Sequence, residues 1–161
     1  LYLEALRDVV RQLAAVHADE SGGTAALRIR ALLTRHMRYM ARHRKLALHL
    51  FRGGLGTDPE AWRIIDASRA QATNWVAEML QLDPAHPALR LMLRALAGAI
   101  DEATVHWLTH ARSLPPDQLI EALLEHLTAA LRGAHCLDPT LDVTAALRML
   151  ARRTASLAVE K

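Results

Sequence analysis

The segment AIDEATVHWLTHARSLPPDQLIEALLEHLTAALRG, residues 99–133, decides the fold of this chain. It holds the end of one helical pattern and the whole of a second, separated by the run SLPPDQ at residues 113–118. Pro116 suits the first turn of a helix, where its missing N–H is no loss. The first pattern extends upstream, so the sequence predicts two long helices at 87–112 and 116–132 that lie antiparallel.

Both helices are apolar around more of their circumference than one buried face requires. Surplus apolar surface of this kind indicates contact with a second chain, and two copies would form an intermolecular four-helix bundle. We therefore expect a homodimer that is held together by these two helices. The expected interface residues are Leu93, Ile100, Trp107, Leu119, Ile120, Leu123, Leu127 and Leu131.

The rest of the chain is also helical in pattern, with no convincing alternation of the kind that marks strands. Breaks rich in glycine or proline separate the helices, namely ESGGT at 20–24, RGGLGTDPE at 52–60 and GAHCLDPT at 133–140. We expect Asp138 and Pro139 to open the last helix. The sequence thus predicts an all-α fold, an antiparallel bundle of about six to seven helices. The remaining expected helices span residues 1–18, 24–43, 44–52, 58–81 and 139–158.

Length, charge and cysteine content narrow the class of protein. The chain has 161 residues, which is typical of one domain, and a formal net charge of +3. Its single cysteine, Cys136, excludes an internal disulfide and fits a reducing compartment such as the cytoplasm. No apolar run approaches the roughly 18 residues of a membrane span, so no membrane partner is expected.

The segment RHMRYMARHRKLALHLF, residues 35–51, is amphipathic. Its arginines are expected to stay in water, whereas its methionines and leucines indicate a face that turns inward. His36 borders the inward face, where a neutral imidazole can hydrogen-bond across a cavity. A packed histidine without a ligand is the simpler alternative.

Arg69 lies within an apolar stripe of the helix expected at 58–81. One interpretation is that its side chain extends outward into solvent or pairs with Asp66 or Glu78. The other is that Arg69 is a buried cation that awaits an acidic or polar group of a ligand.

These inward stripes predict a mainly apolar cavity that binds a small hydrophobic effector molecule bearing an acidic or hydrogen-bonding group. Ligand sites of this kind measure roughly 300–1,000 Å³ and contain few polar groups. We expect His36 and Arg69 to provide the polar contacts. The expected lining residues are Leu33, His36, Met37, Met40, Leu48, Phe51, Trp62, Ile65, Arg69, Met79, Glu102 and His106.

The sequence lacks the patterns that mark most enzymes. Glu102, His106 and His110 follow one another at helical spacing and could face one metal ion, but a zinc site needs further ligands. There is no His-Glu-x-x-His motif, no paired Glu-x-x-His motif and no phosphate-binding loop. We therefore expect no enzyme activity, no catalytic residues, no metal and no cofactor.

Three segments resemble the C-terminal effector-binding and dimerisation domain of the TetR family of transcriptional regulators. LYLEAL at residues 1–6 looks like the start of the helix that leaves that family's DNA-binding domain. The segment at 99–133 is similar to the last two helices of the family, with Trp-Leu near the end of the first and a leucine ladder in the second. The order of long helix, short helix, Gly-rich loop and long helix within 24–81 also fits.

The resemblance implies a bacterial, homodimeric transcriptional regulator, and specifically a repressor, that responds to a ligand. It implies that residues 1–133 form the ligand-binding and dimerisation domain, with 1–18 as the connecting helix. The DNA-reading helices of the family are not in this sequence, so we expect operator DNA to be bound through a missing N-terminal domain. The helix at 139–158 extends past the family's usual end, and we expect residues 134–161 to pack on the same domain as an extra helix.

A second class of function stays open at this point. The chain could be a helical protein-interaction or scaffold module with a fully packed core and no small-molecule site. Methionine and aromatic side chains fill cores as readily as they line pockets, so their presence discriminates only weakly.

Overall fold

Seven α-helices and no strand account for the regular structure in the residues that the computed structural model describes, which are 2–18, 22–51, 58–110 and 113–158. This confirms the all-α prediction. None of the helices in these ranges combines the length and apolarity that crossing a membrane requires. The helices are α1 (Tyr2–His17), α2 (Ala25–Arg42), α3 (Arg44–His49), α4 (Pro59–Met79), α5 (Pro87–His110), α6 (Pro116–Leu137) and α7 (Thr144–Ala158).

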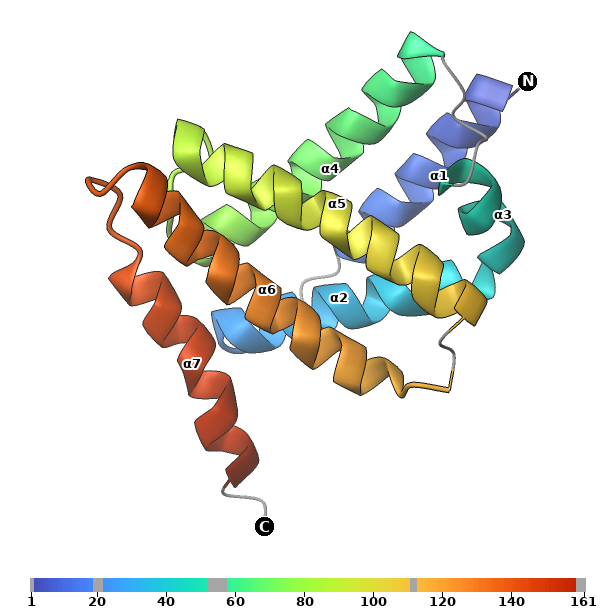
Figure 1. The fold of residues 1–161 in the computed structure, drawn as a ribbon. Helices are drawn as coiled ribbons and strands as arrows, with labels where there is room; N and C mark the ends of the chain where they lie inside the picture. The colour runs from blue at the N-terminus through green and yellow to red at the C-terminus, as the bar shows by residue number, and fades with distance from the viewer. Residues whose placement is uncertain (1, 19–21, 52–57, 111–112, 159–161) are drawn as a thin grey trace.

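Helix α2 occupies the centre of the molecule and contacts the other six helices. Helices α5 and α6 run side by side in opposite directions across it, and α1 lies against α4 (Figure 1). Helix α7 packs against α2 and α6, at the far side of the molecule from α1 and α3 (Figure 1). The hydrophobic core therefore surrounds α2, whose Ile29, Leu33 and Met37 are buried.

Local sequence signals set several of the helix ends. The side chain of Thr24 accepts a hydrogen bond from the N–H of Leu27 at the start of α2. Asp58 caps α4 in the same way by accepting from the N–H of Glu60 at 2.9 Å, and Pro59 occupies the first turn. Such caps satisfy N–H groups that have no partner within the helix. They fix where α2 and α4 begin, and with them the positions of the inward-facing side chains.

The prediction for the end of α6 and the start of α7 was wrong. Helix α6 continues through Gly133 to Leu137, so the proposed domain boundary after residue 133 falls inside it. The flexible end of the Met92 side chain on α5 occupies the space beside Gly133: a Cβ added to Gly133 would lie 2.7 Å from the methyl carbon of Met92. Helix α7 begins at Thr144, whose N–H donates to the carboxylate of Asp142 at 2.9 Å.

Most side chains expected at a dimer interface lie inside this chain instead. Leu93, Trp107, Ile120, Leu123, Leu127 and Leu131 are buried, and Ile100 and Leu119 are partly buried against the same core. The leucine-rich sides of α5 and α6 face the rest of the molecule, because the other helices supply the larger apolar surface that they cover. The small exposed residues of α5 and α6 are Ala95, Gly98, Ala99, Ala122 and Ala129, here called the small-residue surface. Exposed charged and imidazole side chains of the same two helices include Arg94, Glu102, Glu125 and His126, and Leu91 and Leu137 are exposed too.

Candidate ligand-binding cavity

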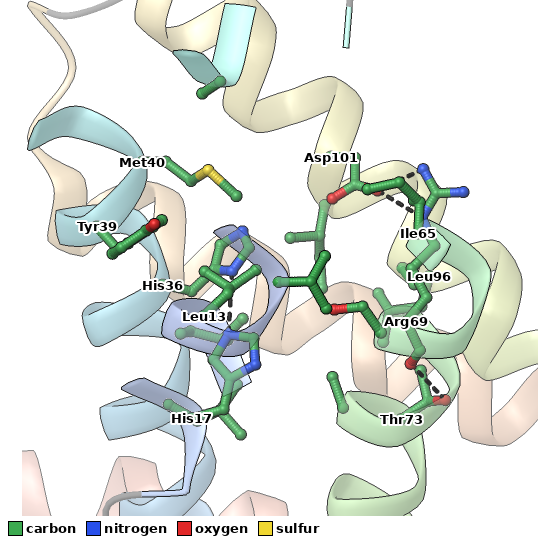
Figure 2. Close-up of a pocket in the computed structure, with 18 of the residues that line it drawn as sticks. Leu13, His17, His36, Tyr39, Met40, Ile65, Arg69, Thr73, Leu96 and Asp101 are labelled. Carbon is green, nitrogen blue, oxygen red and sulfur yellow. Dashed lines mark hydrogen bonds and ion pairs between the residues drawn. The ribbon is translucent and has the colours of Figure 1, made fainter. Parts of the chain in front are cut away.

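A cavity of about 120 Å³ lies within the helical bundle, between α1, α2 and α3 on one side and α4, α5 and α6 on the other. Apolar side chains form most of its wall, including Leu13, Met40, Ile65 and Leu96 (Figure 2). Half of the lining residues expected from the sequence are brought together here. These are Leu33, His36, Met40, Phe51, Ile65 and Arg69.

The other six expected residues do not line the cavity. Met37 is buried but turns to α5, where the hydroxyl of Thr104 lies 3.4 Å from its sulfur. Trp62 is 43% exposed, which places it at the surface of α4. Leu48 and Met79 are partly buried against the core, whereas Glu102 and His106 are exposed on the outer side of α5.

Helix α1 contributes a wall that the sequence analysis assigned only to a connection. Val9, Val10, Leu13 and His17 all line the cavity. Their spacing of three or four residues was a visible signal, because such residues share one face of a helix. The N-terminal helix therefore touches the same cavity as the predicted ligand-contacting helices.

Two buried histidines form the polar part of this wall. The Nε2 atom of His17 lies 3.2 Å from the Nδ1 atom of His36, and the two rings stack with centroids 5.4 Å apart. Arg35 fixes the end of α1 beside them by donating to the carbonyls of Val16, at 2.7 Å, and His17, at 3.3 Å. The edge of the Trp75 ring meets His17, with the two ring planes at 88°.

Both histidines are neutral at physiological pH. Burial, with His17 as a second cause, lowers the pKa of His36 to about 3. Burial, followed by the nearby Arg35 guanidinium, lowers the pKa of His17 to about 4. The Nε2 atom of His36 is buried and has no hydrogen-bond partner among the described residues. A buried polar atom without a partner costs about 1–3 kcal/mol, so this nitrogen favours a bound group that can pair with it.

An ion pair stands on the opposite wall (Figure 2). The Nε and Nη2 atoms of Arg69 lie 2.7 Å and 2.6 Å from the same carboxylate oxygen of Asp101. Asp66 is 3.6 Å from Arg69 and also pairs with Arg94 at 2.6 Å. Burial raises the pKa of Asp101, although the Arg69 guanidinium opposes this effect.

Arg69 is therefore not a cation that awaits a ligand, because the protein supplies its carboxylate. Asp66, one of the two partners expected from the sequence, is 3.6 Å away, but the closer partner is Asp101, which lies on another helix and was not expected. A signal was present: Leu93, Ala97 and Asp101 are spaced by four residues and share one face of α5. The cavity thus combines neutral imidazoles with a self-compensated ion pair and carries no excess charge of its own.

This chemistry fits reversible binding of a small molecule by apolar contact and hydrogen bonds. Within the described ranges, no group of three or more His, Cys, Asp or Glu side chains is placed to hold a metal ion. Cys136, the one cysteine, is exposed on α6 and lies outside the cavity lining.

Residues 25–130 match the family model described as tetracyclin repressor-like, C-terminal domain. The structure is similar to the crystal structure of a TetR-family transcriptional regulator from Streptomyces coelicolor, with a TM-score of 0.77 and 19% sequence identity. That alignment covers 92% of this chain and 66% of the other, so the chain spans just under two thirds of that protein's length. No curated protein sequence matches the chain. Since the family model covers well over half of the residues, the chain belongs to the tetracyclin repressor-like C-terminal domain family.

Proposed function

We propose that this chain is the effector-binding and homodimerisation part of a ligand-responsive transcriptional repressor. The observation that carries this function is the cavity, whose lining residue His36 has a buried Nε2 atom without a partner among the described residues. A scaffold module with a fully packed core would have no such cavity, and the buried polar atoms of a packed core are hydrogen-bonded. The protein acts in the cytoplasm of a bacterium and is not an enzyme.

The cavity is smaller than the sites that hold drug-sized ligands, which measure roughly 300–1,000 Å³. Its volume of about 120 Å³ is close to that of an engineered apolar cavity of about 150 Å³ that binds benzene. The effector is therefore a compact molecule, and a larger one would have to displace helices as it enters.

Helix α1 is the route from the ligand to DNA. Val9, Leu13 and His17 line the cavity on the inner side of α1, and in this proposal α1 is the helix that connects to the DNA-binding domain. A ligand that contacts α1 in one arrangement more favourably than in another shifts the population toward that arrangement. Operator DNA is bound by an N-terminal helix-turn-helix domain outside these 161 residues.

The homodimer forms through the exposed small-residue surface of α5 and α6, which was defined above. Gly98 has open space over it, and small residues on two adjacent helices let partner helices approach closely. Stable homodimer interfaces bury roughly 2,000 Å² or more, an area that two long helices from each chain can supply.

Fluorescence anisotropy with operator DNA and the full-length regulator tests this function. A compact apolar molecule that raises the melting temperature of the chain is expected to release the DNA at similar concentrations. Ligand at 100 times its dissociation constant adds about 2.7 kcal/mol of stability to the form that binds it. A chain that no compact or larger apolar compound stabilises would instead be a packed interaction module.

A further inference from the structure

The polar groups of the cavity determine which ligands it accepts. Tyr39 donates its hydroxyl to Gln12 at 3.0 Å, and the hydroxyl of Thr73 donates to backbone carbonyls of its own helix. His43 is an exposed lining residue whose ring contacts that of Tyr39 at a tilt of 37°. The Nε2 atom of His36 is thus the buried hydrogen-bonding atom of the lining that lacks a partner in the described structure.

The His17–His36 pair allows that atom to act in either of two ways. If His17 donates to the Nδ1 atom of His36, then the Nε2 atom of His36 carries a proton and donates. If His36 donates through Nδ1, its Nε2 atom is an acceptor. A hydroxyl group is both donor and acceptor, so it satisfies either tautomer, whereas a carbonyl satisfies only one of them.

The opposite wall disfavours a charged ligand. Arg69 shares its charge between Asp101 and Asp66, so an incoming carboxylate would have to replace Asp101 or lie beside it. An incoming cation would find the carboxylates of Asp101 and Asp66 already paired with Arg69 and Arg94. The His17–His36 pair is uncharged, and the charges of Arg69 and Asp101 compensate each other. A charged ligand group would therefore lose its hydration without gaining a free counter-charge.

We propose that the effector is an uncharged hydroxyl compound about the size of one ring, of the phenol class. Its hydroxyl pairs with the Nε2 atom of His36, and its ring lies among Leu13, Met40, Ile65 and Leu96. This inference rests on the proposed function, because it concerns the same cavity.

Calorimetric titration with phenol, benzene and benzoate at pH 7.5 tests the ligand class. Phenol is expected to bind about 3–10-fold more tightly than benzene, the ratio that corresponds to one net hydrogen bond, and benzoate more weakly than either. His36→Leu is expected to remove the preference for phenol, whereas His36→Gln, which can still donate and accept, retains part of it. The matched control His106→Leu changes an exposed histidine of α5 and is expected to leave all three affinities unchanged.

Each result bears on one of the two proposals. Unfolding curves identify variants that fail to fold, and a crystal structure with phenol shows whether the ring lies in the cavity. If phenol and benzene bind equally in the cavity, the effector is not a hydroxyl compound, but the proposed ligand-sensing function stands. A preference for benzoate has the same consequence. Phenol that binds outside the cavity, or a phenol preference that His36→Leu leaves intact, overturns the role of His36. Absence of cavity binding by these probes and by larger apolar compounds overturns the proposed function itself.

Discussion

The buried polar residues of this protein offset the loss of their hydration in two different ways. Arg69 and Asp101 remain charged next to each other, so each compensates the other. His17 and His36 give up their charge, because burial lowers the pKa of both rings well below the ordinary value. These two pairs face each other across an otherwise apolar cavity (Figure 2). Each pair leads to a prediction about stability.

The free energy of unfolding is expected to fall as the pH drops from about 6.5 toward 4. The unfolded chain takes up protons on His17 and His36 in this window, whereas the folded chain, with pKa values of about 4 and about 3, resists them. The stability contribution is therefore complete above the unfolded pKa and is lost as the pH falls. Each histidine contributes a slope of up to about 1.4 kcal/mol per pH unit.

Urea unfolding at pH 7.5, 6.5 and 5.5 measures this slope in the wild type and in His36→Leu. The variant is expected to show a shallower slope, and His106→Leu the wild-type slope. Other charged groups near the pair, which are Arg35 on α2, Arg69 on α4 and Asp101 on α5, remain in both proteins. Asp101, whose raised pKa acts in the opposite direction, therefore cancels from the comparison. Identical slopes in wild type and His36→Leu would contradict the neutral, buried state of His36.

Arg69→Met is expected to destabilise the fold by about 1–3 kcal/mol, because it leaves the desolvated carboxylate of Asp101 without its partner. The double variant Arg69→Met/Asp101→Leu should recover part of this loss, since neither charge then remains buried. Chemical unfolding of both single variants and the double variant gives the coupling between the two side chains. Arg94→Met, a change in an arginine that is 53% exposed, serves as the control with an effect below about 1 kcal/mol. Additive effects of the two cavity substitutions would show that the pair is not coupled.

At the scale of elements, the close approach of α5 and α6 determines how the bundle packs. Gly133 lies against the side chain of Met92, and the leucines of both helices belong to the same hydrophobic core as α2. Other inter-helix links are polar and lie nearer the surface. Arg30 of α2 pairs with Glu121 of α6, and Arg7 of α1 pairs with Glu60 of α4.

Gly133→Leu is expected to destabilise the fold by about 1–3 kcal/mol, because the added side chain overpacks the space held by Met92. Gly133→Ala is the matched control, because it adds only one methyl group at the same position. Its methyl group meets only the flexible end of Met92, so the contact is offset by the better helix propensity of alanine, which amounts to about 0.5–1 kcal/mol. Thermal unfolding of the three proteins measures the difference. A Leu variant as stable as the Ala variant would mean that Met92 moves aside at little cost.

At the scale of the whole molecule, the outer surface of α5 and α6 is the surface proposed to pair two copies. Ala129→Arg places a charge on this surface and is expected to produce a folded monomer. Leu123→Arg is expected to unfold the chain instead, because Leu123 is buried within one copy. The control Ala145→Arg changes an exposed alanine of α7 and should remain dimeric. Sedimentation velocity at micromolar concentration distinguishes these states, and a wild-type monomer would refute the proposed dimer.

The secondary structure of this chain could be read from its sequence because the signals for it are local. Apolar residues at three- and four-residue spacing indicate helices, and Thr24, Asp58 and Pro116 mark where three of them begin. The end of α6 was placed too early because Gly133 resembles a helix stop when its neighbours are unknown. The start of α7 was placed too early because Asp138 and Pro139 look like a helix start, whereas α7 begins at Thr144. In the folded chain the space beside Gly133 is filled by the side chain of Met92, which lies 41 positions earlier in the chain.

The sequence by itself determined an all-α chain with amphipathic helices, and half of the cavity lining that was expected from it. Only the tertiary structure decided which apolar side of α5 and α6 faces inward, because periodicity defines a helix face but not its neighbour. Only the tertiary structure, too, brought His17 beside His36 and Asp101 beside Arg69, pairs separated by 19 and 32 positions along the chain. The physical reason is that hydrogen bonds and ion pairs depend on distance in space. The packing of the helices around α2 sets that distance.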